Sequence, residues 1–465
     1  MTEQTSLQTE NKKLSRSENK ARLRQIIEIL NKHEVVKGLT PEKLRAILED
    51  LGPTYIKLGQ IMSMRSDMIP QAYCDALTQL RSSVPPMPFD EVRRVVEGSL
   101  GKPIEEVYSD FNEEPIGAAS IAQAHEAHLK DGTHVVVKVQ REGIYEIMSQ
   151  DMTLLRKAAG ILKLAPGTGE ILDFGIILDE MWKVSQEEMN FTIEAQNAET
   201  FYKNNEDVVF ATCPRIYREE TTPQVLTMEF IDGISVDNKA KLLENGYDLD
   251  EIGAKLADNY IKQVIEDGFF HADPHPGNIR IREGEIVWID MGMMGRLSKR
   301  DQALFAKAVA AVAQHDVEGI KSVVLSIGKC RGKVDHAKLY IDIDEMLSRY
   351  GDADLGGLDL GQLMNECMDI AREHKIAMPE GVSMLGRGVL TIEGVIADLS
   401  PDTNVISIAT ARAANMAVDK FDVGKELRSG ARFAAESFKK AMAIPGLLSD
   451  SLKSLSKGQT RVGLD

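Results

Sequence analysis

Apolar positions recur at helical spacing from Ala21 to Leu100. Leu23, Ile26 and Leu30 lie three and four residues apart, which is the spacing of an amphipathic helix. Thr40-Pro41 is a typical helix start, and later prolines divide the pattern into further helices. We therefore predict that the chain begins with a module built from helices.

Strict alternation of residue types begins at Ala122. The segments AQAHEAHLK and THVVVKVQ flank the turn Asp131-Gly132, and this pattern is typical of two antiparallel strands joined by a tight turn. Lys138 lies on the second of these strands. A small antiparallel sheet is therefore expected next in the chain.

A long helical pattern follows this sheet. Its second part is predicted to run without a break from about Ile176 to Tyr202, with Glu194 well inside it. The apolar run from Val225 to Ile231 is then predicted as a buried strand, which ends at Asp232-Gly233. Helix and sheet therefore alternate through this part of the chain.

Polar, proline-rich residues mark the middle of the chain. Leu249 to Phe270 is predicted as a helix that leads into the segment HADPHPGN. Two short strands, NIRI and EIVWI, flank a turn at Glu283-Gly284 and are followed at once by Asp290. The pattern after Ser298 is helical.

The net charge of −17 argues against broad electrostatic attraction to nucleic acid. The four cysteines form no C-x-x-C pair, so neither a zinc site nor a disulfide framework is indicated. No apolar run approaches the roughly 20 residues of a spanning helix. The acidic first residues resemble no targeting signal. We therefore expect a cytoplasmic protein.

The chemistry is indicated by residues that suit phosphoryl transfer from ATP. That reaction needs magnesium against the phosphates, a cation on their oxygens and a carboxylate that orients the attacking hydroxyl. Asp273 and Asn278 have the interval of the protein-kinase catalytic loop H-R-D-x-x-x-x-N. Asp290 stands in IDMG, where kinases have D-F-G. Lys138 matches the kinase strand lysine, and Glu194 is its natural ion-pair partner.

Each of these residues has a plainer interpretation when taken singly. A lone lysine on a strand or a lone glutamate on a helix is usually a solvated surface residue. Their occurrence together in kinase order favours a catalytic role. His271 and His275 could suggest a metal site, but no third ligand is evident nearby. We interpret both histidines as packing or hydrogen-bonding residues of the loop.

The order of these elements predicts an α+β fold of the bilobal, protein-kinase-like type. It has an N-terminal helical extension and a helix-rich C-terminal lobe. The predicted parts are a disordered tail over 1–20, the helical extension over 21–110, an N-lobe with inserted helices over 111–232, and a helical C-lobe with the catalytic loop over 233–465.

The segment before Lys138 departs from an ordinary kinase. PIGAASIAQ stands where kinases have G-x-G-x-x-G, so alanine replaces most of the glycine. Each Cβ removes access to positive φ and blocks the closest backbone approach to a phosphate. The nucleotide should therefore be held differently, although a plain strand entry is the alternative. The residues that we expect to contact the nucleotide are Gly117, Ala118, Ala119, Ser120, Lys138, Glu229 and Ile231.

Four stretches between Leu51 and Gly295 together resemble one family. They are LGPTYIKLGQIMSMRSDMIP, GAASIAQAH with VVVKVQREGI, EMNFTIE, and HADPHPGNI with IDMG. Their joint occurrence is far more specific than any one of them. On these segments the chain is similar to the UbiB family of atypical kinases, also called the aarF-domain or ABC1 family.

The resemblance implies ATP and Mg²⁺ as cofactors. It also implies that Asp273 is the catalytic-loop aspartate, that Asn278 and Asp290 bind magnesium, and that Lys138 pairs with Glu194.

A further implication concerns Lys57 and Gln60 of the K-x-G-Q sequence. In this family the K-x-G-Q helix lies over the active site where a peptide substrate would otherwise bind. ATP hydrolysis or phosphorylation of a small molecule is therefore expected before protein phosphorylation. Without the resemblance, Lys57 would be interpreted as a surface residue.

Two departures from the family pattern matter. The family usually has E-x-D where this chain has Glu188-Met189-Asn190, so a charged side chain is replaced by an amide and a metal contact there is in doubt. We group Lys57, Gln60, Glu188 and Asn190 as substrate-occluding or regulatory residues.

The second departure is that no hydrophobic membrane anchor is evident before Asp465, where family members commonly have one or two. We therefore expect a soluble member or one whose anchor has been removed, peripheral to the inner face of a bacterial membrane. The amphipathic stretch RLRQIIEILNKHEVVKGL could touch a membrane surface, but a helix packed on the kinase lobe is the favoured alternative.

The expected function is that of an atypical kinase or ATPase that supports the synthesis or handling of ubiquinone or other isoprenoid lipids. Expected partners are ATP, a quinone precursor or lipid, a membrane surface and quinone-biosynthesis proteins, with no nucleic acid. One alternative is a small-molecule phosphotransferase of the aminoglycoside or choline kinase type, which the K-x-G-Q and alanine-rich segments disfavour. Another is a pseudokinase that regulates a lipid-handling complex, which the intact set of polar residues disfavours.

Overall fold

The computed structural model describes residues 21–35, 38–63, 69–80, 85–162, 174–350 and 360–419. The tail predicted over 1–20 lies outside these ranges, as does the chain beyond 419. The chain divides into two compact units, Met1–Thr410 and Ala411–Asp465, and the site described below lies in the first.

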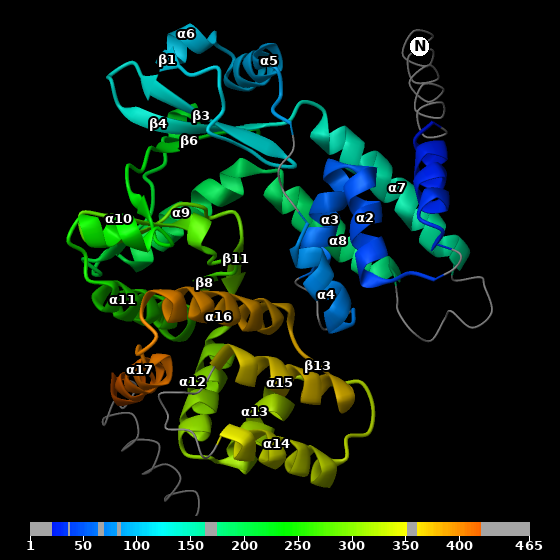
Figure 1. Ribbon diagram of the computed structural model, residues 1–465, viewed down its shortest axis with the longest axis vertical. Helices are drawn as coiled ribbons and strands as arrows, with labels where there is room; N and C mark the ends of the chain where they lie inside the picture. Colours follow the sequence, from blue (N-terminus) through cyan, green and yellow to red (C-terminus); the bar gives the residue numbers. More distant parts are fainter. Residues whose placement is uncertain are drawn as a thin grey trace, which may run out of the picture. The chain divides into compact units, whose positions relative to one another are not determined.

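The N-terminal region is helical, as predicted. After a helix over 21–32, whose residues Ile26, Ile29 and Leu30 pack on the neighbouring apolar core, three helices follow in close succession. Figure 1 shows two of them, in blue, lying against longer helices from later in the chain. These helices are α2 (Pro41–Leu51), α3 (Pro53–Ser63) and α4 (Gln71–Thr78), which pack with α7 (Ile144–Leu162) and α8 (Phe174–Glu188).

One antiparallel sheet forms the smaller lobe, and it contains the predicted hairpin. Gly132 has a φ of 84°, so the Asp131-Gly132 turn uses the conformational freedom of glycine. The first helix after α4 packs on one face of this sheet (Figure 1). The elements are α5 (Phe89–Leu100), α6 (Ile104–Val107), β1 (Tyr108–Phe111), β2 (Gly117–Ala118), β3 (Ala122–Leu129), β4 (His134–Gln140) and β6 (Val225–Glu229). β1 begins at Tyr108, two residues before the predicted boundary at 110, and the domain limits stay predictions.

The prediction of one unbroken helix from Ile176 to Tyr202 is wrong. The chain forms α8 and then α9 (Phe191–Asn204), because Asn190 leaves the helical conformation with φ −118° and ψ 91°. Its side chain accepts a hydrogen bond from the Thr192 N–H and so caps α9. Glu194 consequently lies in the first turn of α9 rather than deep inside a long helix.

The larger lobe holds a second sheet beside the catalytic loop. The predicted helix ending at Phe270 stops earlier, because Gly268 adopts the left-handed conformation and the next residues pair as a strand. The hairpin at Glu283-Gly284 forms as predicted, with both residues at positive φ. The elements are β5 (Ala211–Thr212), β7 (Ile234–Ser235), α10 (Lys239–Glu244), α11 (Leu249–Lys262), the π-helix η3 (Gln263–Asp267), β8 (Phe269–His271), β9 (Ile279–Arg282), β10 (Glu285–Trp288) and β11 (Met294–Arg296), with 3₁₀ turns at Arg218–Glu220 and Pro276–Asn278.

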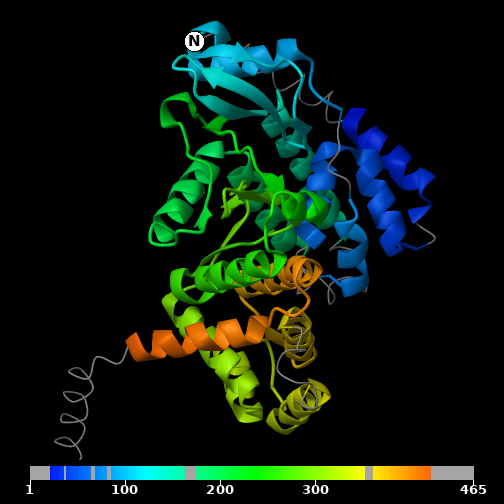
Figure 2. The same ribbon diagram turned by 60° about the vertical axis from the view of Figure 1, so that its left-hand side comes forward.

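Helices dominate the remaining part, as predicted. α16 (Glu380–Leu399) packs on both α11 and α15 (Leu360–Glu373). Figure 1 shows its orange ribbon running below β8 and β11, and in the turned view of Figure 2 it still lies below these green strands. The other elements are α12 (Lys299–Ala313), α13 (Val317–Ile327), β12 (Lys329–Cys330), α14 (His336–Tyr350), β13 (Ile376–Ala377) and α17 (Val405–Asp419). The expected α+β architecture, a sheet-based lobe followed by a helix-rich lobe, is confirmed.

Candidate active site

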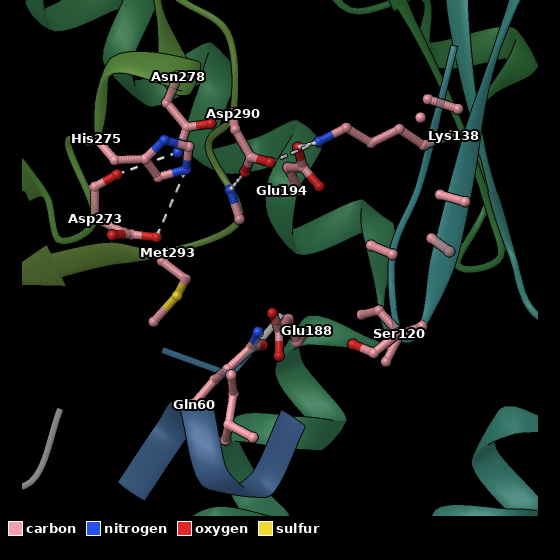
Figure 3. Close-up of a pocket in the computed structure, with 18 of the residues that line it drawn as sticks. Gln60, Ser120, Lys138, Glu188, Glu194, Asp273, His275, Asn278, Asp290 and Met293 are labelled. Carbon is pink, nitrogen blue, oxygen red and sulfur yellow. Dashed lines mark hydrogen bonds and ion pairs between the residues drawn. The ribbon is translucent and has the colours of Figure 1, made fainter. Parts of the chain in front are cut away.

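A cavity of about 670 Å³ lies between the two lobes. Its walls include the alanine-rich loop from Gly117 to Ala122 and the segment that carries Asp273 and Asn278. Lys138, Glu194 and Asp290 also line it, so the fold brings these predicted polar residues to one place (Figure 3).

Lys138 is held by two carboxylates. Its Nζ lies 2.5 Å from Glu194 Oε1 and 3.2 Å from Asp290 Oδ2. Burial alone would lower the pKa of Lys138, but the two negative charges outweigh burial and raise it. Burial and the neighbouring Asp290 raise the pKa of Glu194, against the effect of Lys138. Lys138 therefore stays an ammonium that faces the cavity.

Asp290 is fixed by the backbone that follows it. Its Oδ1 accepts a hydrogen bond of 2.8 Å from the Gly292 N–H, while Oδ2 faces Lys138. Burial raises the pKa of Asp290, but Lys138 and the Gly292 N–H lower it more, so the pKa lies below its usual value. The side chain remains 43% exposed to the cavity. An ionised carboxylate is therefore available to a cation.

His271 connects the catalytic loop to the backbone of Asp290. Its Nδ1 accepts a hydrogen bond from the Asp273 N–H at 3.2 Å, so Nε2 must carry the proton that it donates to Asp290 O at 2.6 Å. Burial lowers the pKa of His271, which favours this neutral form. The ring also stacks on buried Trp288. His271 is thus a packed hydrogen-bonding residue that sets the loop against Asp290.

Asp273 and Asn278 are joined within the loop. Asn278 Nδ2 donates a hydrogen bond of 3.1 Å to Asp273 O, and among the described residues the Asn278 side-chain oxygen has no protein donor. His275 Nδ1 accepts from the Gly277 N–H, and its Nε2 lies 4.0 Å from Asp273 Oδ2. The carboxylate of Asp273 is 37% exposed, so it remains accessible from the cavity.

Comparison with known proteins identifies the family of this chain. A family model described as the ABC1 atypical kinase-like domain matches residues 79–324, which is more than half of the chain. A second model, described as the UbiB helical domain, matches residues 343–404. The chain belongs to the ABC1 atypical kinase-like family.

Two relatives are similar to this chain along most of their length. The "Uncharacterized protein in hydrogenase 1 5'region" of Clostridium pasteurianum is 38% identical, over 91% of this chain and 80% of that protein. "Probable protein kinase UbiB" of Cellvibrio japonicus is 30% identical, over 89% of this chain and 76% of that protein. The solved complex of Rv3197 from Mycobacterium tuberculosis with erythromycin has a TM-score of 0.53 at 25% identity, over 78% of this chain and 93% of that chain. The kinase-like fold expected from the sequence is confirmed.

The K-x-G-Q segment that the ABC1 resemblance pointed to forms part of α3 beside the cavity. Gln60 and Glu188 both line the cavity, and Figure 3 shows them pointing toward one another. A Cβ on Gly59 would lie 2.7 Å from Leu48 Cδ1 and closer still to Leu80, so the glycine permits tight packing of α3 on α2 and α4. The side chain of Lys57 lies outside the described residues.

Asn190, which replaces the usual ABC1-family aspartate, does not line the cavity. Its Oδ1 accepts hydrogen bonds from Thr192 N and Thr192 Oγ1, at 3.2 and 2.6 Å. In this chain the position therefore has a structural task that needs only an acceptor, which an amide performs as well as a carboxylate.

The structure does not bring Glu229 and Ile231 to the cavity. Glu229 ends β6, where its Oε1 lies 2.6 Å from Arg282 Nη1. Its other carboxylate oxygen accepts from the Arg215 N–H at 3.2 Å. Both residues lie at the end of the strand that was predicted from Val225 to Ile231.

Arg387 of α16 lines the cavity, although the sequence analysis did not single it out. Its Nη1 donates a hydrogen bond of 2.8 Å to Ser63 Oγ. Burial lowers the pKa of Arg387, and the negative charge of Asp273 acts in the opposite direction. The available signal was that Arg387, which lies between two glycines, is the only basic residue of α16. In this member of the ABC1 family a cation from the UbiB helical domain thus faces the catalytic loop.

Within the described ranges, no helix is both long enough and apolar enough to span a membrane.

Proposed function

We propose that this chain is an atypical kinase or ATPase that binds Mg-ATP in the cavity between its lobes. The observation that carries the proposal is the position of the Lys138 ammonium, which two carboxylates hold in the same cavity as Asp273 and Asn278. A cation, a free carboxylate and an amide oxygen in one cavity are the groups that phosphoryl transfer requires.

The residues fit a magnesium ion. Asp290 and Asn278 supply oxygen atoms, which are the ligands that Mg²⁺ prefers, and Asp290 stays ionised. In the described part of the chain, no group of three or more His, Cys, Asp or Glu side chains forms a separate metal cluster. Magnesium usually takes only one or two carboxylates from the protein and completes its shell with water and phosphate. When bound, it would neutralise charge on the phosphates.

Each polar residue then has a distinct task. Lys138 holds phosphate oxygens, and Glu194 keeps the lysine in place from the first turn of α9. Asp273 orients the hydroxyl or water that attacks, because its accessible carboxylate can accept that proton. His271 stays neutral and sets the distance between the loop and Asp290.

The surroundings favour a small acceptor over a protein. The lining includes Gln60 and Ser63 of α3, Leu77 and Thr78 of α4, and Arg387 of α16. A peptide would have to displace these side chains. This supports hydrolysis of ATP, or phosphorylation of a small molecule in the handling of isoprenoid quinones or related lipids at a membrane surface, as the family resemblance implies.

The test is Mg²⁺-dependent ATP hydrolysis by the purified protein. Asp290→Asn and Lys138→Ala are expected to abolish turnover while the fold survives, as monitored by circular dichroism. Lys262→Met is a matched control, because Lys262 forms a similarly buried ion pair with Asp267 outside the cavity, at 2.9 Å. This control should lose stability but keep turnover per folded molecule. Unchanged turnover in both cavity variants would refute the proposal.

The acceptor can be sought in the same assay. Turnover is measured with and without lipid vesicles and phenolic quinone precursors, and products are analysed for transferred phosphate. Stimulation without a phosphorylated product identifies an ATPase. A phosphorylated precursor identifies a small-molecule kinase.

A further inference from the structure

The alanine-rich loop is tied to its surroundings by an arginine to which the proposed function gives no task. Arg141 directly follows β4, three positions after Lys138. Its backbone N–H donates to Ile121 O at 2.8 Å, and its Nε donates to Ala119 O at 2.9 Å. Both acceptors belong to the part of the loop that lines the cavity.

A second nitrogen of the same guanidinium binds the segment 85–88. Arg141 Nη2 donates a hydrogen bond of 2.9 Å to Pro85 O, at the start of the segment 85–88 that leads into α5. Met87 in this segment is bound to buried Gln123 of β3, with its N–H 2.7 Å from Gln123 Oε1. The guanidinium therefore bridges the alanine-rich loop and the segment 85–88.

The contacts of this partly buried arginine are all with the backbone. Both side-chain acceptors are backbone carbonyls, and the described residues offer Arg141 no ion pair. Burial lowers the pKa of Arg141, and the negative charge of Glu91 offsets this effect only in part. Because one guanidinium donates to a carbonyl of each segment, its hydrogen bonds join the two segments.

The loop composition explains why such a contact matters. A glycine-rich loop can adjust its backbone around a phosphate, whereas alanine restricts φ and adds a Cβ at each position. The loop shape must therefore be suitable before the ligand arrives. A binding loop that is ordered in advance loses less conformational entropy when the ligand binds.

We propose that Arg141 is a positioning residue that holds the alanine-rich loop in the shape that receives the nucleotide phosphates. Through its hydrogen bond to Pro85 O, Arg141 also links the conformation of this loop to that of the segment 85–88. This inference rests on the proposed function only in taking ATP as the ligand.

The test compares Arg141→Gln with Arg141→Lys. Arg94→Gln is the matched control, because Arg94 lies in the same lobe and forms an exposed two-point contact with Glu142, the neighbour of Arg141. The first measurement needs no nucleotide: hydrogen–deuterium exchange of peptides that cover 116–123. We expect faster exchange in Arg141→Gln, a smaller increase in Arg141→Lys, and wild-type exchange in Arg94→Gln.

The second measurement separates ATP affinity from turnover. Arg141→Gln should weaken ATP binding and raise KM by roughly tenfold, the effect of losing hydrogen bonds from a charged group. Its kcat should stay within about twofold of wild type, since Arg141 touches none of the proposed reacting groups. Arg141→Lys should recover part of the affinity, because its ammonium can reach one of the two carbonyls.

Wild-type loop exchange in Arg141→Gln would overturn the inference whether or not ATP binds. Unchanged ATP affinity together with a lower melting temperature would also overturn it and leave Arg141 with a purely stabilising role. If the wild type fails to bind ATP while loop exchange still rises in Arg141→Gln, the proposed function fails. In that case the data would still support that Arg141 orders the alanine-rich loop, but not that the loop receives ATP.

Discussion

Arg387 Nη1 donates a hydrogen bond of 2.8 Å to Ser63 Oγ, and this contact joins α16 to the end of α3 across 324 positions of the sequence. Ser63 Oγ in turn donates to Gln60 O at 2.6 Å. The C-terminal helical region thereby supports the helix that carries the K-x-G-Q residues at the edge of the cavity.

The first prediction concerns this contact. Arg387→Gln should lower the free energy of unfolding by about 1.5–3 kcal/mol, because it removes a hydrogen bond made by a charged group in a buried setting. Ser63→Ala should lower the free energy of unfolding by a smaller amount. The double variant should be less destabilised than the sum of the two, as measured by urea unfolding. Additive losses would show that the two side chains do not stabilise each other.

The second prediction concerns the support of Lys138. Glu194→Gln leaves the lysine with Asp290 as its only carboxylate partner among the described residues. Losing one charge-assisted hydrogen bond, about 1.5–3 kcal/mol, should slow ATP hydrolysis by roughly 10- to 100-fold. Steady-state kinetics measures this effect. Glu199→Gln is the control, because Glu199 lies on the same helix but pairs with exposed Arg218. Equal turnover of the two variants would contradict the assigned role.

The third prediction concerns the break between α8 and α9. Asn190→Ala should destabilise the protein by about 1 kcal/mol through loss of the helix cap, whereas Asn190→Asp should keep the cap. Asn238→Ala removes the corresponding cap of α10 and should cost a similar amount. Only Asn190→Ala should also slow ATP hydrolysis, because Glu194 lies in the first turn of the helix that Asn190 caps. Thermal unfolding and kinetics on the same samples separate these effects.

The fourth prediction concerns pH. Burial lowers the pKa of His125, against a smaller opposite effect of its hydrogen bond with Asn112 O. In the unfolded chain His125 has the ordinary histidine pKa of about 6.5. Below that pH the unfolded chain therefore protonates His125 more readily than the folded chain does. The contribution of neutral, buried His125 to the free energy of unfolding is complete above a pH of about 6.5. It is lost progressively as the pH falls below that value.

His125→Gln should weaken this dependence. The slope of unfolding free energy against pH between 6.5 and 5 should be shallower than in the wild type, by at most about 1.4 kcal/mol per pH unit. Urea unfolding at several pH values measures both slopes. Identical slopes would show that His125 does not titrate differently in the two states.

Local patterns predicted the parts of the site whose geometry depends on near neighbours. The Asp131-Gly132 turn forms because a glycine accepts a positive φ, and alternating residues then place the strand of Lys138 in the sheet. The interval between Asp273 and Asn278 likewise belongs to one short loop, in which the two residues contact each other directly.

Other features were missed because their causes are not local. Asparagine has only a weak preference against helix, and the apolar residues before and after Asn190 have the spacing of one continuous helix. The break is decided by the capping bond to Thr192 and by the packing of α9 on β6. Glu229, which was expected beside the nucleotide, does not line the cavity, and its carboxylate pairs with Arg282, 53 positions away.

The sequence by itself determined the α+β pattern, the tight turns, the spacing of the loop residues and the replacement of glycine by alanine before Lys138. These features depend on backbone preferences and side-chain chemistry that act over a few residues. Only the tertiary structure decided that Arg387 faces the cavity and that Arg141 bridges the alanine-rich loop and the segment 85–88. Such contacts depend on how whole helices and strands pack, because packing brings together side chains that no local pattern connects.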